Sequence, residues 1–244
     1  MKRYYYDLHT HSCLSPCGDD DNTPNNVVGM AKLCGIDILA LTDHNSCKNC
    51  PAFFEAAEKY NIIPIAGMEL TTSEDIHVVC LFERLEDALA FDARVDAGRM
   101  KIPNRPDIFG RQCILDGEDN LIGEEKDLLI NATDISISEV KQIVEEFGGI
   151  CYPAHIDKES NGIIAILGSL PQDDPFDYYE LHNNNNIEEY STKYGVPKDR
   201  FIVSSDAHYL TDFRDMENYF EMNESSDNQS IRAELFDILR RRLV

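Results

Sequence analysis

The chain has 244 residues, of which 43% are hydrophobic and 27% are charged, the composition of an ordinary globular protein. No run reaches the ~18–20 apolar residues of a membrane-spanning helix, and the basic N-terminal segment lacks the apolar core of a secretory signal. The sequence therefore disfavours membrane and exported classes and predicts a cytoplasmic protein.

The formal net charge is −23 at pH 7, with 45 acidic and 22 basic residues. Repulsion over most of such a surface disfavours a long polyanion, so we expect neither a long nucleic acid nor a membrane as partner. A small anionic phosphorylated substrate remains compatible if bound divalent ions concentrate positive charge locally. The sequence specifies no oligomeric state.

Short apolar runs alternate with amphipathic helical patterns along the chain. The predicted strands are 4–8, 36–42, 62–68, 77–82, 150–154, 178–181 and 201–205. The predicted helices begin near Pro24, Ala52, Leu85, Ser136, Gly162, Ile187 and Ile231. This alternation predicts an α/β fold with a parallel sheet, and about seven units are enough to close the sheet into a barrel.

Local signals refine this outline. Thr23 precedes a proline at the first helical position, and Ser136 with Glu139 forms a capping-box pattern. Residues 99–127 break the alternation with prolines, glycines and scattered charge, which predicts a loop-rich excursion that either covers a site or is a surface insertion. We expect one domain over residues 1–244.

The cysteines are expected to be reduced thiols, because the chain is long and carries no export signal. Cys47 and Cys50 form a CxxC pattern, and Cys13 and Cys17 follow the first strand. A zinc or redox role would require a second CxxC or a thioredoxin-like setting, so buried or incidental cysteine is the favoured interpretation.

Six of the seven histidines lie at ends of predicted strands, together with two carboxylates. They are His9, His11, His44, His77, His155 and His208, accompanied by Glu69 and Asp206. In a parallel barrel the carboxyl ends of all strands meet at one mouth. Residues i and i+2 of a strand point to the same side, which suits the His-x-His pair for one ion. This pattern predicts a site for zinc, manganese or iron.

Five motifs in order carry a resemblance to a known family. They are Asp7-Leu-His-Thr-His-Ser12, Thr42-Asp-His-Asn45, Gly67-Met-Glu-Leu-Thr71, Pro153-Ala-His155 and Ser205-Asp-Ala-His208. In this order they resemble the motifs of the PHP (polymerase and histidinol phosphatase) family, from residue 7 to about 210. The resemblance implies a distorted (β/α)7 TIM-like barrel and two or three divalent ions.

The resemblance also implies a ligand set. It gives one ion to His9, His11, Glu69 and Asp206, and a second ion to Glu69 as bridge with His77 and His155. A third ion takes His44, His208 and an acidic residue that follows His11. The family often has Ser-Asp-Gly there, whereas this chain has Ser15-Pro-Cys-Gly18. Aligning Thr23-Pro24 with the family's Thr-Pro selects Asp19 as this ligand, with Asp20 as the alternative.

The implied reaction is hydrolysis of a phosphoester by metal-activated water, on a small phosphomonoester, a nucleotide or a short oligonucleotide. We expect Glu69, Asp206 and His208 to act in catalysis. Candidate substrate contacts are Lys158, His182, Arg105 and Arg111. Asp7 and Asp43 either orient imidazoles or are ordinary strand-end aspartates. The alternatives are a metal-dependent hydrolase of a non-phosphate bond, amidohydrolase-like, and a non-catalytic metal-binding domain.

Overall fold

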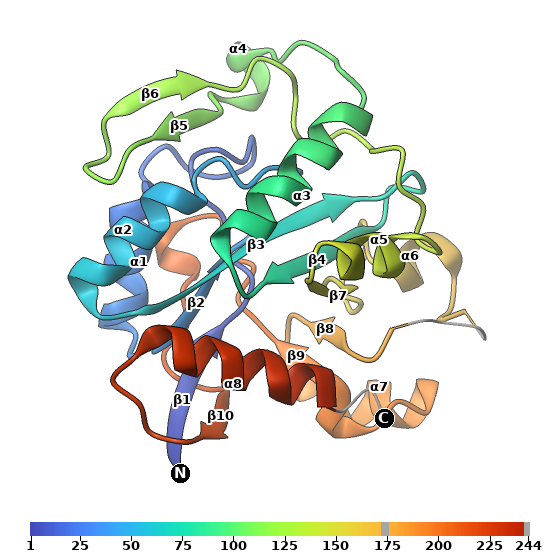
Figure 1. The fold of residues 1–244 in the computed structure, drawn as a ribbon. Helices are drawn as coiled ribbons and strands as arrows, with labels where there is room; N and C mark the ends of the chain where they lie inside the picture. Colours follow the sequence, from blue (N-terminus) through green and yellow to red (C-terminus); the bar gives the residue numbers. More distant parts are fainter. Residues whose placement is uncertain (172–175, 242–244) are drawn as a thin grey trace.

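The computed structural model describes residues 1–171 and 176–241 (Figure 1). One sheet has six strands, in the spatial order β10 (Tyr219–Met222), β1 (Lys2–Asp7), β2 (Ile38–Leu41), β3 (Ile63–Thr71), β4 (His77–Phe82) and β7 (Ile150–Pro153). A parallel pair, β8 (Tyr179–Leu181) and β9 (Phe201–Val203), lies between β7 and β1. The amide of Ile156 donates to Glu180 O (2.9 Å) and that of Asp206 to His9 O (3.0 Å). The predicted α/β barrel-like fold is confirmed.

The sheet is parallel from β1 to β3 but not beyond. Strand β4 is antiparallel to both β3 and β7, so the prediction of a wholly parallel sheet is wrong at this strand. Residues 72–76 join β3 to β4, and a connection this short allows only a hairpin. His77 opens β4 and lies opposite Thr71, near the end of β3. The reversed strand therefore delivers its first residue to the mouth where the parallel strands end.

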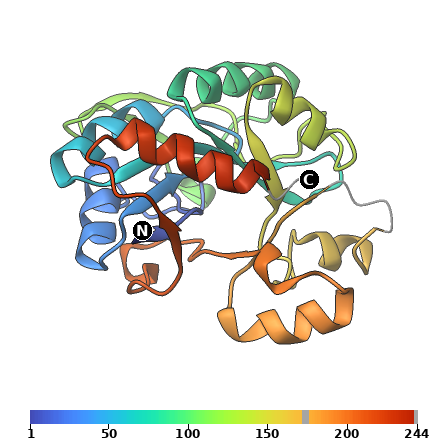
Figure 2. The same cartoon turned by 60° about the horizontal axis from the view of Figure 1, so that its bottom comes forward.

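The two faces of the barrel wall bury different clusters of side chains. On β3, Ile63 and Ile65 face the interior, whereas Ala66 and Met68 pack outward against the surrounding helices. Helix α8 (Asn228–Arg241) adds Phe236 and its neighbours to the interior cluster. Figures 1 and 2 show α8 close to the chain's N-terminus, at the end opposite the β5–β6 hairpin. One end of the barrel is thus filled with apolar side chains, which leaves the other end for polar chemistry.

The remaining helices connect these strands. They are α1 (Pro24–Leu33), α2 (Cys50–Tyr60), α3 (Leu85–Gly98), α4 (Pro106–Phe109), α5 (Val140–Glu146), α6 (Ile163–Leu167) and α7 (Ile187–Tyr194). Thr23 caps α1 as predicted, accepting a hydrogen bond from the amide of Asn26. Helix α5 begins four residues later than predicted, because Ser136 and Glu139 close a separate turn before it.

The excursion at residues 99–127 is more regular than the predicted loop. It contains α4 and an antiparallel hairpin of β5 (Cys113–Leu115) and β6 (Leu121–Glu124), drawn at the top of Figure 1. The amide of Cys113 donates to Cys13 O (3.0 Å), and the Asn49 side chain donates to Cys113 O (3.0 Å). The hairpin therefore lies against the segments that follow β1 and β2.

The helices and the cysteines of the described residues relate to two expectations from the sequence, the absence of a membrane-spanning helix and the presence of reduced thiols. None of their helices has both the length and the apolar character needed to cross a bilayer. The eight cysteines are free thiols, and Cys47 donates its thiol proton to the carbonyl of Gly67 (3.1 Å). Cys47, just before α2, and Cys50, its first residue, are both buried and pack with the outer apolar cluster.

Replacing Phe91 with alanine tests the packing of α3 on the barrel. Phe91 is fully buried between Phe82 and Phe147, at ring-centroid distances of 5.1 and 5.7 Å. We expect Phe91→Ala to lower the free energy of unfolding by about 3–5 kcal/mol in urea titrations. The matched Leu89→Ala on the exposed side of α3 should cost about 0.5 kcal/mol or less. Equal losses in the two variants would contradict this packing.

Candidate metal centre

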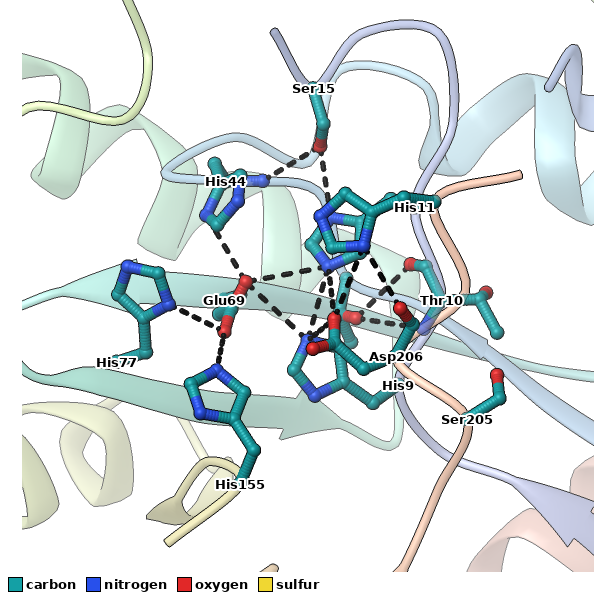
Figure 3. Close-up of polar contacts among 12 residues, drawn as sticks. His9, Thr10, His11, Ser15, His44, Glu69, His77, His155, Ser205 and Asp206 are labelled. Carbon is teal, nitrogen blue, oxygen red and sulfur yellow. Dashed lines mark hydrogen bonds and ion pairs between the residues drawn. The ribbon is translucent and has the colours of Figure 1, made fainter. Parts of the chain in front are cut away.

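The carboxylate of Glu69 lies at the centre of a cluster of imidazoles (Figure 3). Glu69 is on the interior face of β3, near the end of the strand, and is only 1% exposed. Its Oε2 lies within 3.4 Å of three ring nitrogens, from His9 (3.4 Å), His11 (3.3 Å) and His44 (3.1 Å). Its Oε1 lies near two others, from His77 (2.8 Å) and His155 (3.0 Å). One carboxylate therefore faces two sets of nitrogens.

Three groups of side chains have ligand atoms close enough to hold an ion. The first is His9, His11, Glu69 and Asp206, the second is His44, Glu69 and His77, and the third is His11, His44 and His208. The first group has the membership that the resemblance implied. His44 approaches Glu69 and His77 as well as His208, so it lies between the second and third positions. His155 reaches the cluster through Glu69 Oε1.

The polar atoms of the cluster fit divalent ions better than they fit one another. Glu69 Oε2 and the Nδ1 atoms of His44 and His77 are buried without a hydrogen bond to any described residue. They are nevertheless close to possible partners, since His44 Nδ1 lies 3.1 Å from Glu69 Oε2 and His77 Nδ1 lies 2.8 Å from Glu69 Oε1. Their lone pairs are therefore close but not aligned as donor and acceptor. Buried polar atoms rarely stay unsatisfied, because each costs free energy. Imidazole and carboxylate donors suit zinc, manganese or iron.

The neighbouring carboxylates raise the pKa of two histidines of the cluster. Burial alone lowers the pKa of His9, but the charges of Glu180, Asp206 and Glu69 raise it well above its usual value. For His11, burial is likewise outweighed by hydrogen bonds to Asp206 and Glu69, and its pKa rises to about 9. Burial dominates at His208 and, with the charge of His11, lowers its pKa to about 4. Protons thus supply the positive charge that buried carboxylates require.

Asp43 supports His11 through a serine. Ser15 Oγ donates to Asp43 Oδ1 (2.7 Å) and lies 3.0 Å from His11 Nδ1, which can donate to it. The chain His11–Ser15–Asp43 fixes the ring so that Nε2 faces the cluster. Asp7 instead accepts from the backbone amides of Ser205 (3.1 Å) and His9 (3.4 Å). These two hydrogen bonds hold the backbone at His9 and at Ser205, and neither of them involves an imidazole ring.

Glu180 was missed by the sequence reasoning. It is 1% exposed on β8, and its Oε2 contacts His9 Nδ1 (2.8 Å) and accepts from the amide of His155 (3.0 Å). The available signal was an acidic residue in an otherwise apolar predicted strand, two positions after Tyr178 and therefore on the same, interior face. That signal becomes visible only once the interior face of β8 is known.

Of the remaining predicted site residues, Lys158 contacts a member of the cluster, whereas the side chains of Asp19 and Asp20 do not belong to it. Asp19 donates its amide to His208 O (3.0 Å), but its carboxylate accepts from the amide of Asp21 (2.9 Å) and belongs to none of the three groups. Asp20 is exposed and also lies outside these groups. Lys158 contacts Asp206 Oδ2 directly.

Of the other predicted substrate contacts, His182 is paired with Arg214. Arg214 donates to its carbonyl oxygen (2.6 Å) and lies 2.9 Å from its Nε2. Arg105 is exposed and paired with Asp107 (2.8 Å). Arg111 is exposed and donates from Nε to Glu124 (2.9 Å). Both arginines lie on the excursion.

Comparisons with known proteins bear on the family and the fold. The sequence model of the PHP domain matches residues 7–194. The PolC-type DNA polymerase III of Thermotoga maritima is 28% identical over 206 residues, which are 83% of this chain but 13% of the polymerase. A similar structure from Bifidobacterium adolescentis is assigned as a metal-dependent phosphoesterase. It shares 18% identity and a TM-score of 0.58 with this chain, and the match covers 98% of this chain and 96% of that one.

The lesion-specific endonuclease Q of Pyrococcus furiosus shares the fold more closely, with a TM-score of 0.67 at 18% identity over 95% of this chain and 55% of that one. A second endonuclease Q structure, with 17% identity, the same TM-score and coverage of 97% and 57%, contains a 27-mer duplex substrate with an abasic lesion at the active site. The expectation that a long nucleic acid is excluded as partner is therefore wrong. Net charge averages over the whole surface, whereas binding depends on the charge around the site.

Metal binding should release protons, since ligand nitrogens must give up theirs to an ion. His11, with a pKa of about 9 in the metal-free protein, is protonated at pH 7.5, so affinity should rise as the pH increases towards 9. Calorimetric zinc titrations in buffers of different ionisation enthalpy should show net proton release at pH 7.5. Binding without proton release, or affinity that falls over this pH range, would contradict the assigned protonation.

Proposed function

The chain belongs to the PHP domain family, and we propose that it is a metal-dependent phosphoesterase whose ions are held by the cluster around Glu69. The proposed ligands are His9, His11, His44, Glu69, His77, His155, Asp206 and His208, with Asp19 as a further candidate. The chain spans 13% of the length of its PolC-type relative and 55% of endonuclease Q, so their activities are not transferred as a whole.

The division of the Glu69 carboxylate between two sets of nitrogens supports this proposal most strongly. Oε2 faces His9, His11 and His44, whereas Oε1 faces His77 and His155. A carboxylate with nitrogens gathered around each oxygen has the arrangement of a bridging ligand. Ions bound there would polarise water and neutralise the oxygens of a phosphate. Glu69 and Asp206 hold the negative charge that keeps such ions in place.

Two cations beside the cluster fit a phosphate-bearing substrate. Lys158 contacts Asp206 and keeps 33% of its side chain exposed. Arg214 contacts His182 and has no carboxylate within 4.0 Å among the ion pairs of the described residues. We propose that Lys158 and Arg214 attract and orient the substrate phosphate, with His182 as a neutral neighbour. The pKa of His182 is lowered by burial and by these two cations.

The proposed substrates are phosphoesters of nucleotides or nucleic acids. The duplex bound by endonuclease Q supports this class, because the two proteins share the fold that presents the site. The similarity to a PolC-type polymerase sequence points in the same direction. No particular nucleotide, sequence or lesion is implied by these comparisons.

A panel of substrates tests the proposal. Protein reconstituted with manganese or zinc should cleave at least one of bis-p-nitrophenyl phosphate, nucleoside phosphates, single-stranded DNA and duplex DNA with an abasic site. A chelator should abolish the cleavage. If every phosphoester is left intact by fully metallated protein, the proposal fails, and hydrolysis of an amide substrate in the same panel would favour an amidohydrolase.

Within the same assays, Glu69→Gln should reduce turnover by more than about 100-fold, because even partners behind metal ligands contribute about 10–100-fold. Glutamine keeps the shape of the side chain but removes the charge that bridges the two sets of nitrogens. The exposed Glu58→Gln on α2 makes the same chemical change far from the buried cluster and should retain activity. Full activity of Glu69→Gln would refute the bridging assignment.

A further inference from the structure

We infer that Glu180 is a positioning residue that couples the two sides of the metal centre through its Oε2 atom. The inference rests on the proposed function, because it takes His9 and His155 to be ligands. His9 follows β1 and His155 follows β7, and the two belong to opposite sides of the Glu69 carboxylate. One oxygen of Glu180 contacts both residues.

Among the described residues, the side chain of Glu180 directs its hydrogen bonds to this pair. Oε2 lies 2.8 Å from His9 Nδ1 and 3.0 Å from the amide nitrogen of His155, in a side chain that is 1% exposed. Oε1 is buried and has no hydrogen bond to any described residue. A carboxylate buried this deeply without a full set of partners is costly, so a role limited to general packing does not explain it.

At His9, the contact selects which nitrogen faces the ions. With Glu180 accepting the Nδ1 proton, Nε2 is the nitrogen that loses its proton when an ion binds and that offers its lone pair to the ion. Nε2 lies 3.3 Å from Asp206 Oδ1 and 3.1 Å from His11 Nε2, among the atoms of the first ligand group. A carboxylate behind a ligand histidine fixes its tautomer and increases its basicity.

At His155, the contact holds the backbone instead of the ring. His155 has a φ of 29°, in the region that residues other than glycine rarely adopt. The hydrogen bond from its amide to Glu180 Oε2 restrains this conformation as the chain leaves β7. Its Nε2 then lies 3.0 Å from Glu69 Oε1. Loss of the Glu180 charge is therefore expected to disturb both sides of the centre together.

Asp7 provides a matched control. It is 4% exposed at the end of β1 and accepts from the amides of His9 and Ser205, but its hydrogen bonds do not reach an imidazole. Asparagine keeps Oδ1 as the acceptor for both amides, so Asp7→Asn removes the charge of a buried carboxylate while the backbone bracing and the link between the two ligand histidines remain. A difference between Glu180→Gln and Asp7→Asn thus separates positioning of ligands from loss of buried charge.

The test is calorimetric titration with zinc, together with the visible spectrum of the cobalt-loaded protein. We expect Glu180→Gln to weaken zinc binding by about 10–100-fold and to change the cobalt bands, and Asp7→Asn to leave the bands in place. Wild-type affinity and spectrum in Glu180→Gln would overturn the inference while leaving the proposed function intact. Retention of all bound zinc by Glu69→Gln would instead overturn the ligand assignment itself.

A measurement on the wild-type protein keeps the inference testable if Glu180→Gln does not fold. In zinc-loaded protein with ¹⁵N-labelled histidine, the His9 Nδ1 proton should give a downfield NMR signal that is protected from solvent exchange. Its partner in the bond is Glu180, so the signal should show through-space contacts to protons of β8. A His9 ring protonated at Nε2, or an Nδ1 proton that exchanges freely, would contradict the inference.

Discussion

The carboxylate of Glu69, almost fully removed from water among five imidazoles, is the constraint on which the structure of the site depends. A buried carboxylate must be compensated by positive charge, and burial alone raises its pKa. Here the surrounding histidines outweigh burial and keep the pKa of Glu69 well below its usual value. Protons on His9 and His11 provide that charge without metal, and divalent ions are proposed to provide it in the active protein.

The backbone carries part of the cost of this arrangement. His155 and Asp206 have positive φ angles of 29° and 53°, which residues other than glycine adopt at a cost of about 1–3 kcal/mol. Both turn the chain sharply as it leaves the barrel wall. The apolar interior and α8 fill the opposite end of the barrel, which leaves the polar residues of the site at the mouth. The hydrogen bond from His155 to Glu180 shows how a neighbouring strand restrains such a turn.

Much of this could be predicted from the sequence, because apolar runs mark strands and strand ends meet at one mouth. All seven predicted strands of the barrel wall are present, and the predicted strand-end histidines converge on Glu69 or on one another. The direction of β4 was missed, because periodicity reports burial and not strand direction. His77 nevertheless reaches the mouth, since the reversed strand begins there.

Partners brought together only by the fold could not be predicted. Glu180 looks like an isolated acidic residue until the interior face of β8 is known, and Arg214 is distant in sequence from His182. Asp19, which alignment with a family motif selects, accepts a local hydrogen bond from Asp21 in the structure, and its role as a ligand stays a prediction. The expectation that excluded long nucleic acids was wrong for a related reason, because the net charge of a chain does not say how charge is distributed around the site.

The most direct test of the bridged centre is anomalous diffraction from crystals loaded with manganese. The account predicts at least two manganese peaks, about 3.5–4 Å apart, with one oxygen of Glu69 directed to each. It is contradicted by a single ion that does not touch Glu69, or by ions bound elsewhere while the imidazoles keep their present positions.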